Sequence, residues 1–319
     1  QSAKVLARIA REGFAKQNID TLRGLLSHPD HRGRTEAHLA LAHRGSDGLD
    51  ALAATVHSDG DTMPRIHAIW GLWAMARWDA ALHTDAVEVI EEAAGDDNPE
   101  VRAQVAHVLG DLGEGGETLA ELVFDESPRV VAFAAAGLGS TGTLDDMDAI
   151  AEALWALEDE PDLYVRHAAV MGLAGIGDRD RLLELLNDMQ PQVRLGALLA
   201  LRKLRDPAVA MLLRDNDPFI AAEAARLATE AEAERAETLG MRVVKLRFGI
   251  VLSARGGALP KMLPLFRLGL GGPLGPGRRW FPWVAEADTL GLLRFALDHE
   301  ISGPLNAVAP GAVRMSEFA

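Results

Sequence analysis

The sequence lacks the residues on which several classes of chemistry depend. Its 319 residues include no cysteine, which excludes disulfides, thiolate metal sites, iron–sulfur clusters and the cysteine attachment of a c-type haem. No apolar run approaches the roughly 20 residues that span a bilayer, and no basic and apolar leader opens the chain. We therefore expect a soluble protein without membrane insertion. The compartment, cytoplasmic or periplasmic, stays unknown.

Basic residues are also scarce in most of the chain. The formal net charge is -15, and residues 1–228 hold 21 basic and 38 acidic residues, a net charge of -17. Such an acidic surface repels nucleic acid and anionic membranes, so we expect no nucleic-acid partner. The plainer interpretation is that the acidity only keeps the protein in solution.

One stretch, residues 96–113, sets the pattern for everything before residue 229. Asp96 and Asp97 are suited to cap a helix, and Pro99 fits the first helical position because no amide hydrogen bond is needed there. An apolar face follows, and Gly110 and Gly113 are expected to end the helix. The apolar face consists of Val101, Val105, Val108 and Leu109.

Variants of this stretch recur with prolines at 29, 64, 99, 128, 161, 191 and 218, and a shorter amphipathic helix is expected between copies, for example over 144–157. One short and one longer helix per period make a hairpin, and stacked hairpins make an α-solenoid. The pattern D-x-x-P-x-V-R-x-x-A-x-x-A-L-G resembles HEAT-like repeats of the phycobilisome-lyase type. The opening also resembles the HEAT region of membrane-associated dehydrogenases fused to a haem domain, but haem binding does not carry over without C-x-x-C-H.

Arg102, Arg166 and Arg194 recur at one position of the repeat. Each is predicted to pair with the aspartate of the adjacent repeat and so to form a ladder between hairpins. We assign this ladder to structure, because functional arginines need not follow the repeat period.

The pattern changes at about residue 229. A charged helix leads to an apolar run, MRVVKLRFGIVLS, that predicts a buried strand. A helix is expected over 260–267, a glycine and proline loop over 269–277, another helix from Asp288 and a short strand over 305–309. Strand and helix alternate here, which indicates α/β structure. The expected fold is mainly α: a HEAT-like α-solenoid over 1–228 with a small C-terminal α/β segment over 229–319.

This tail resembles the C-terminal third of bacterial NAD(P)-dependent epimerase-like proteins, which are extended short-chain dehydrogenase/reductases. The matching stretches are AETLGMRVVKLRFGIVLS, GGALPKMLPLFRLGLGGPLG, the W-x-x-W of Trp280 and Trp283, and GPLNAVAPGAV. In that family the dinucleotide site and a Tyr-x-x-x-Lys pair precede this segment, and helical repeats stand in their place here. The resemblance leaves a candidate remnant of the substrate side at Arg247, Lys261, Arg278 and Arg279.

Other candidates favour structural interpretations. Gly137, Gly139 and Gly142 spell the dinucleotide fingerprint, but they follow a helix, so we interpret them as a helix stop. Tyr164 has Ala168 where a catalytic lysine would stand, and we expect it to fill space between repeats. The histidines, including His28, His31, His38 and His43, show no metal-ligand spacing.

Trp70, Trp73 and Trp78 form a stripe that is usually core. A groove lined by Trp73 and Trp78 is the candidate partner-binding site, because aromatic side chains dominate binding hot spots.

The sequence therefore predicts a non-catalytic HEAT-repeat scaffold for a protein or peptide partner, with no catalytic, cofactor-binding or metal residues. The alternative is an NAD(P)-dependent nucleotide-sugar epimerase or reductase whose cofactor half lies outside this chain. A third possibility is a recent fusion selected for neither activity. The strand over 242–248 is expected to pair only with 305–308, so residues 241–319 are predicted either to dock on the last hairpin or to mediate self-association.

Overall fold

The computed structural model describes residues 2–155, 162–253, 255–256, 258–268, 271–272, 277–311 and 313–318. The chain divides into two compact units, Gln1–Ala228 and Thr229–Ala319. The mainly α fold, a HEAT-like solenoid with a few short strands near the C-terminus, is confirmed. No helix in the described ranges is long and apolar enough to cross a bilayer.

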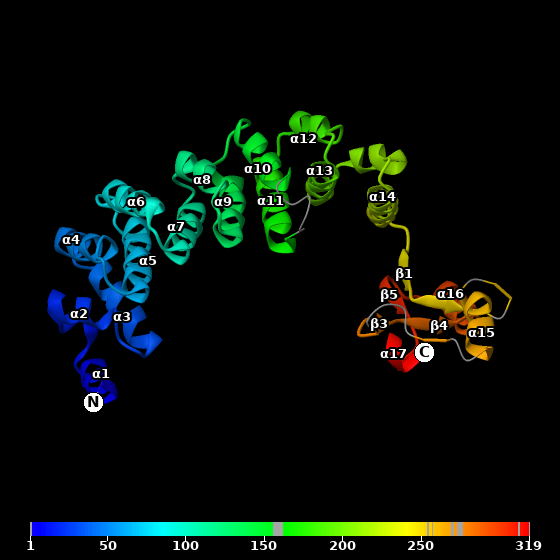
Figure 1. Ribbon diagram of the computed structural model, residues 1–319, viewed down its shortest axis with the longest axis horizontal. Helices are drawn as coiled ribbons and strands as arrows, with labels where there is room; N and C mark the ends of the chain where they lie inside the picture. Colours follow the sequence, from blue (N-terminus) through cyan, green and yellow to red (C-terminus); the bar gives the residue numbers. More distant parts are fainter. Residues whose placement is uncertain are drawn as a thin grey trace. The chain divides into compact units, whose positions relative to one another are not determined.

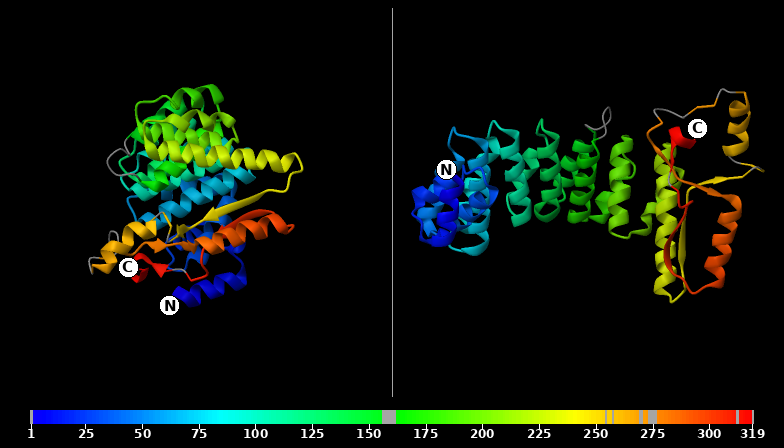
Figure 2. Two further views of the ribbon diagram at one scale, coloured as in Figure 1. Left: turned by 90° about the vertical axis from the view of Figure 1, so that its right-hand side faces the viewer. Right: turned by 90° about the horizontal axis from the view of Figure 1, so that it is seen from below.

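The first unit is a stack of helical hairpins (Figures 1 and 2). A leading helix, α1 (Ser2–Glu12), is separated from the short η1 (Phe14–Lys16) by Gly13 at φ 94°. The first helices of the pairs are α2 (Ile19–Leu25), α4 (Gly45–Val56), α6 (His83–Glu92), α8 (Gly116–Leu122), α10 (Asp146–Trp155), α12 (Arg179–Leu185) and η3 (Pro207–Arg214); the turn η2 (Ala93–Gly95) follows α6. The second helices are α3 (His31–Ala42), α5 (Thr62–Trp78), α7 (Pro99–Leu112), α9 (Pro128–Thr141), α11 (Leu163–Ile176), α13 (Pro191–Lys203) and α14 (Pro218–Thr238).

Four of the second helices begin at the proline that predicted their start, and two others begin close to theirs. α7, α9, α13 and α14 each start at the proline itself, because its missing N–H costs nothing in the first turn. α3 and α5 start two residues to either side of theirs. The predicted helix start at Pro161 and the predicted helix end at Leu157 lie outside the described residues, as does most of the 269–277 loop.

The cap of α7 differs from the prediction. Asn98 is the N-cap and accepts from the Glu100 amide, whereas the Asp96 carboxylate accepts from the Asn98 amide and pairs with Arg65 of the preceding repeat. The repeated aspartate therefore shapes the turn and receives an arginine, instead of capping the helix.

The arginine ladder is confirmed at two of its three predicted rungs. Arg102 holds Asp125 through two hydrogen bonds of 2.6 and 2.9 Å, and Arg194 holds Asp215 through two of 2.8 and 2.9 Å. Hydrogen bonds from Arg194 keep the pKa of Asp215 below its usual range. Arg166 differs, because it forms no ion pair with any described residue, and the prediction for it was wrong.

Glycines let the second helices pack closely. Gly110 and Gly137 face each other across α7 and α9, where a Cβ on Gly110 would lie 2.6 Å from the Gly137 Cα. Gly139 faces α11 in the same way. Gly110, Gly137 and Gly139 therefore lie inside helices and not at their ends, which corrects the prediction. Of the five glycines predicted to end helices, Gly113 and Gly142 stand at C-caps.

The second unit holds three two-stranded sheets. The strands are β1 (Val244–Phe248), β2 (Ile250–Leu252), β3 (Trp280–Phe281), β4 (Trp283–Ala285), β5 (Gly303–Ala307) and β6 (Val313–Arg314), and the helices are α15 (Ala258–Arg267), α16 (Glu286–Asp298) and α17 (Met315–Phe318). β1 pairs with β5 and β2 with β4 in parallel, and β3 pairs with β6 antiparallel. The predicted pairing of the strand before residue 249 with the strand near 305 is confirmed, with Leu246 beside Leu305.

Candidate functional site: a groove across three second helices

The surface feature best suited to bind a ligand is a groove formed by α9, α11 and α13. A hollow of about 990 Å³ lies chiefly between α9 and α11, and a second of about 490 Å³ lies between α11 and α13. The two share His167, Met171 and Lys203 in their walls. We call the two hollows together the α11 groove.

The floor of the α11 groove is apolar, and an exposed aromatic side chain lies in its lining. Ala132, Phe133 and Ala136 of α9 line the larger hollow together with Met171 of α11. Tyr164, also in the lining, is 83% exposed. The prediction that this tyrosine fills space between repeats was wrong, because it lies on the solvent face of α11 and no neighbouring repeat covers it.

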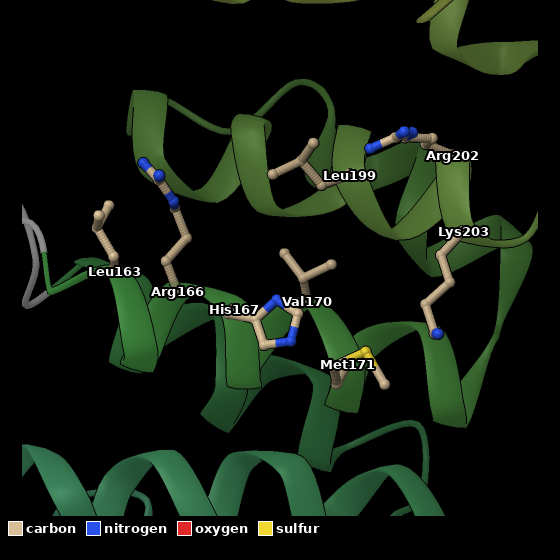
Figure 3. Close-up of a pocket in the computed structure, with 8 residues that line it drawn as sticks. All are labelled: Leu163, Arg166, His167, Val170, Met171, Leu199, Arg202 and Lys203. Carbon is tan, nitrogen blue, oxygen red and sulfur yellow. The ribbon is translucent and has the colours of Figure 1, made fainter. Parts of the chain in front are cut away.

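Cationic groups line the smaller hollow. Figure 3 shows Arg166, His167 and Met171 on α11 facing Leu199 and Lys203 on α13. Among the described residues neither Arg166 nor Lys203 has a carboxylate partner, although Asp188 stands one repeat beyond Arg166 in the sequence. Asp188 instead accepts from the Gln190 amide.

The acidic groups near the groove are already engaged. Asp162 caps α11 by accepting from the amides of Tyr164 and Val165, and Glu100 pairs with Arg129 at 3.0 Å. Arg129 also lies over the Phe133 ring, 5.3 Å from its centroid. Within the part of the chain that the structure describes, the groove therefore offers two cationic groups without a carboxylate partner, Arg166 and Lys203, and apolar surface in a unit that is acidic elsewhere.

The two predicted partner-binding tryptophans do not meet. Trp73 donates through Nε1 to Asp111 of α7, whereas Trp78, which is 52% exposed, stacks against His43 beside α3, with ring centroids 4.7 Å apart. The two indoles thus contact repeats on opposite sides of α5. Trp73 and Trp78 each stay predicted partner-binding residues, but they do not form two walls of one groove.

An aromatic row links the tryptophans to the α11 groove. Trp70 donates to Gln104 and packs edge-on against His107, and His107 stacks on Phe133 with centroids 4.6 Å apart. Burial lowers the pKa of His107 and so favours its neutral form. The row ends at Phe133, which lines the α11 groove.

The histidines near the N-terminus form a buried pair. His38 Nδ1 lies 3.0 Å from His67 Nδ1, and Arg34 donates to His67 Nε2. Since Nε2 accepts, the His67 proton is on Nδ1 and is donated to His38. Burial is the main reason why the pKa of both histidines is lowered to about 4. The neighbouring groups contribute in the same direction, His67 for His38 and Arg34 for His67. The pair packs two repeats together, and in the described part of the chain no cluster of side chains suited to hold a metal occurs.

The candidate remnant residues lie apart in the second unit. Arg247 is in β1, Lys261 is on α15, and Arg278 and Arg279 precede β3. The Arg279 carbonyl accepts from the Met315 amide, which gives this segment a structural contact. As a binding site the four residues stay a prediction.

Sequence reasoning missed the α11 groove, although a signal was present. Tyr164, His167 and Met171 are spaced by three and four residues, and so share one helix face. They lie opposite the buried Val165 and Leu173. Large side chains on the face away from the core predict a contact surface.

Comparison with known proteins divides the chain in the same way. The family model for HEAT repeats matches residues 49–117 and 150–229. Epimerase family protein SDR39U1 of Mus musculus is 49% identical over 80 residues, which are 24% of this chain and 27% of the mouse protein. Epimerase family protein YfhF of Bacillus subtilis (strain 168) is 39% identical over 90 residues, which are 28% of this chain and 29% of that protein. The chain thus spans less than a third of the length of these relatives.

Solved structures show similarity to both parts. The human epimerase family protein SDR39U1 (isoform 2) with NADPH is 26% identical, with a TM-score of 0.29, over 43% of this chain and 57% of that chain. The complex of CpcE and CpcF of phycocyanin lyase from Nostoc sp. PCC7120 is 18% identical, with a TM-score of 0.39, over 69% of this chain and 88% of that chain. The chain therefore carries HEAT repeats in its N-terminal part and, in its C-terminal part, a segment of the kind found in epimerase family proteins.

Proposed function

We propose that this chain is a non-catalytic HEAT-repeat scaffold that binds a protein or peptide segment in the α11 groove. The carrying observation is that Arg166 has no carboxylate partner among the described residues, whereas Arg102 and Arg194 at the same repeat position hold buried aspartates. A buried or half-buried arginine that gains a carboxylate makes a charge-assisted bond worth about 1.5–3 kcal/mol. A ligand carboxylate is suited to take the place that an aspartate takes in the other repeats.

The rest of the groove specifies the remaining features of the ligand. Met171 and Phe133 offer apolar surface for one or two anchoring side chains, and an exposed tyrosine contributes large contact area at little entropic cost. Charges farther than about 10 Å are screened at 0.1 M salt, so the acidic remainder of the unit does not prevent an acidic ligand from binding here. The expected ligand is a peptide segment with apolar anchors and at least one Asp or Glu.

Selection from a phage-displayed library of random peptides tests this proposal. Peptides that carry both apolar and acidic residues should be enriched on the wild-type chain, and their affinity should fall at least about tenfold for Met171→Glu and for Arg166→Glu. Met211→Glu is the matched control, because Met211 is an exposed methionine of η3 outside the groove lining. Failure to enrich peptides, or equal binding to all four proteins, would refute the proposal.

The second candidate function is that of an NAD(P)-dependent epimerase or reductase completed by another chain. The 49% identity to a curated epimerase family protein favours it, as does the NADPH in the solved human relative. The glycines that spell a dinucleotide fingerprint lie in and after α9 and not between a strand and a helix, so these glycines do not form the turn whose amides cradle a pyrophosphate. Titration with NADPH tests this candidate directly.

A further inference from the structure

The larger hollow of the α11 groove contains a further cationic group, Arg129, which has a carboxylate partner. Arg129 stands in the first turn of α9 and belongs to the lining of this hollow. Its Nε lies 3.0 Å from Oε2 of Glu100 on α7, and its Nη2 donates to Oε1 of the same carboxylate at 3.3 Å. The guanidinium therefore faces Glu100 with two nitrogens, which is the most specific arrangement of an arginine and a carboxylate.

Glu100 is itself held in place by its own repeat and the preceding one. Its Oε1 accepts a hydrogen bond of 2.8 Å from Nε2 of Gln104, and Oε1 of Gln104 accepts one of 2.9 Å from the Trp70 indole. Gln104 is only 9% exposed, so water competes little for these two hydrogen bonds. The Glu100 carboxylate is therefore oriented towards Arg129 before any ligand binds.

The ion pair of Arg129 and Glu100 is within reach of a ligand in the groove. The side chain of Arg129 is 58% exposed and that of Glu100 is 40% exposed. The Arg129 guanidinium also lies over the ring of Phe133, 5.3 Å from its centroid, and Phe133 lines the same hollow. A ligand side chain that covers Phe133 therefore comes to lie next to Arg129.

A second carboxylate on the ligand gains little at this position while Glu100 is present. To bind Arg129 it must displace Glu100, which exchanges one ion pair for an equivalent one. Gln104 still holds the displaced carboxylate nearby, and like charges at short distance repel each other. Asp162, which also lines the larger hollow, adds to this repulsion. The α9 side of the groove therefore favours uncharged ligand side chains.

We propose that Glu100 determines the specificity of the α11 groove by neutralising Arg129, so that an acidic group of the ligand binds only beside Arg166. This inference rests on the proposed peptide binding in that groove, and it states which peptides are accepted. The preferred segment has apolar side chains over Phe133 and an acidic residue on the α11 side alone. Glu100 is a positioning residue in this scheme, because it acts through Arg129.

Parallel selections on two forms of the full chain test the proposal. Random peptides displayed on phage are selected on the wild-type chain and on Glu100→Gln, which replaces the carboxylate by a neutral amide of the same size. Peptides selected on the variant should carry on average about one more Asp or Glu than those selected on the wild type. They should also bind the variant at least about fivefold more tightly than the wild type.

Two further variants separate this role from a general effect of charge. Glu223→Gln is the matched control, because Glu223 pairs with Arg226 on α14, outside the groove lining, and its replacement changes the net charge by the same amount. Glu223→Gln should select peptides like those of the wild type. The combination of Glu100→Gln with Arg129→Gln removes the group that binds the second carboxylate, so the gain in affinity should disappear.

Equal numbers of acidic residues in the peptides from the wild type and from Glu100→Gln would overturn the proposal. A gain that Glu223→Gln shares, or that Arg129→Gln leaves intact, would overturn it as well. Failure to enrich peptides on any of these proteins would refute peptide binding in the groove, and this inference with it. Enrichment on the wild type without the expected effect of Glu100→Gln would refute the inference alone, so the two failures are distinguishable.

Discussion

Replacing Gly172 by alanine tests whether glycines set the spacing of the second helices. Gly172 lies inside α11, and a Cβ added to it would be 2.1 Å from the carbonyl oxygen of Ala135 in α9 and 2.9 Å from Cδ1 of Ile150. A real Cβ essentially never comes within 3.0 Å of another heavy atom. The contact to Ala135 must lengthen by about 0.9 Å, and the obstacle is helix backbone, which cannot rotate away.

The expected loss of stability combines two opposing effects. Overpacking of a tight site costs about 1–3 kcal/mol, and a backbone obstacle places Gly172→Ala near the upper end. Alanine in place of glycine in a helix contributes about 1 kcal/mol in the other direction. The free energy of unfolding should therefore fall by about 2 kcal/mol, and the melting temperature by about 4–8 °C for a unit of this size.

Urea unfolding of the full chain, followed by circular dichroism, measures this change. Gly24→Ala is the matched control, because Gly24 lies within α2 and has no atom within 4 Å of an added Cβ; it should raise stability by up to about 1 kcal/mol. The decisive result is that the free energy of unfolding falls for Gly172→Ala and rises for Gly24→Ala. Stabilisation by Gly172→Ala would refute the close approach of α9 and α11.

Three further predictions follow from the same structure. Arg102→Ala removes the partner of the Asp125 carboxylate, which is 8% exposed, and should lower the free energy of unfolding by about 2–4 kcal/mol. Arg166→Ala should change the free energy of unfolding by less than about 0.5 kcal/mol. Equal losses for the two variants in urea unfolding would contradict the difference in their ion pairing. Burial lowers the pKa of His38 and His67 to about 4, so the unfolded state binds more protons than the folded state below about pH 6.5. The stability that is complete above about pH 6.5 should therefore be lost as the pH falls towards about 4. His38→Gln should reduce the difference in the free energy of unfolding between about pH 7 and about pH 5. Titration of the full chain with NADPH, followed by nicotinamide fluorescence, should show no saturable binding, and a micromolar dissociation constant would overturn that expectation.

The solenoid was predictable because its signals are local and repeated. A proline suited to the first helical turn and an apolar face after it are read from about 15 residues, and Pro99, Pro128, Pro191 and Pro218 each begin a helix. The pairing of β1 with β5 was predictable for a different reason, since only these two segments of the second unit were predicted as strands. A likeness to known families added the division near residue 229.

The groove and the ladder depend on which repeat covers which side chain, and no local pattern contains that information. Arg166 and Arg102 occupy the same repeat position and both are followed by an aspartate about 22 residues later, yet only Arg102 holds one. Tyr164 is exposed, and the lining of the hollow beside it includes the small residues Ala132 and Ala136 of α9.

The sequence by itself determined the helical repeat, its period and the change to α/β structure, because backbone capping and amphipathic periodicity act over a few turns of chain. Only the tertiary structure decided that Gly137 and Gly139 are contact points inside a helix and that Arg166 is unpaired among the described residues. Each of these properties depends on the distance between elements that are far apart in the sequence. The packing of all the elements together sets that distance.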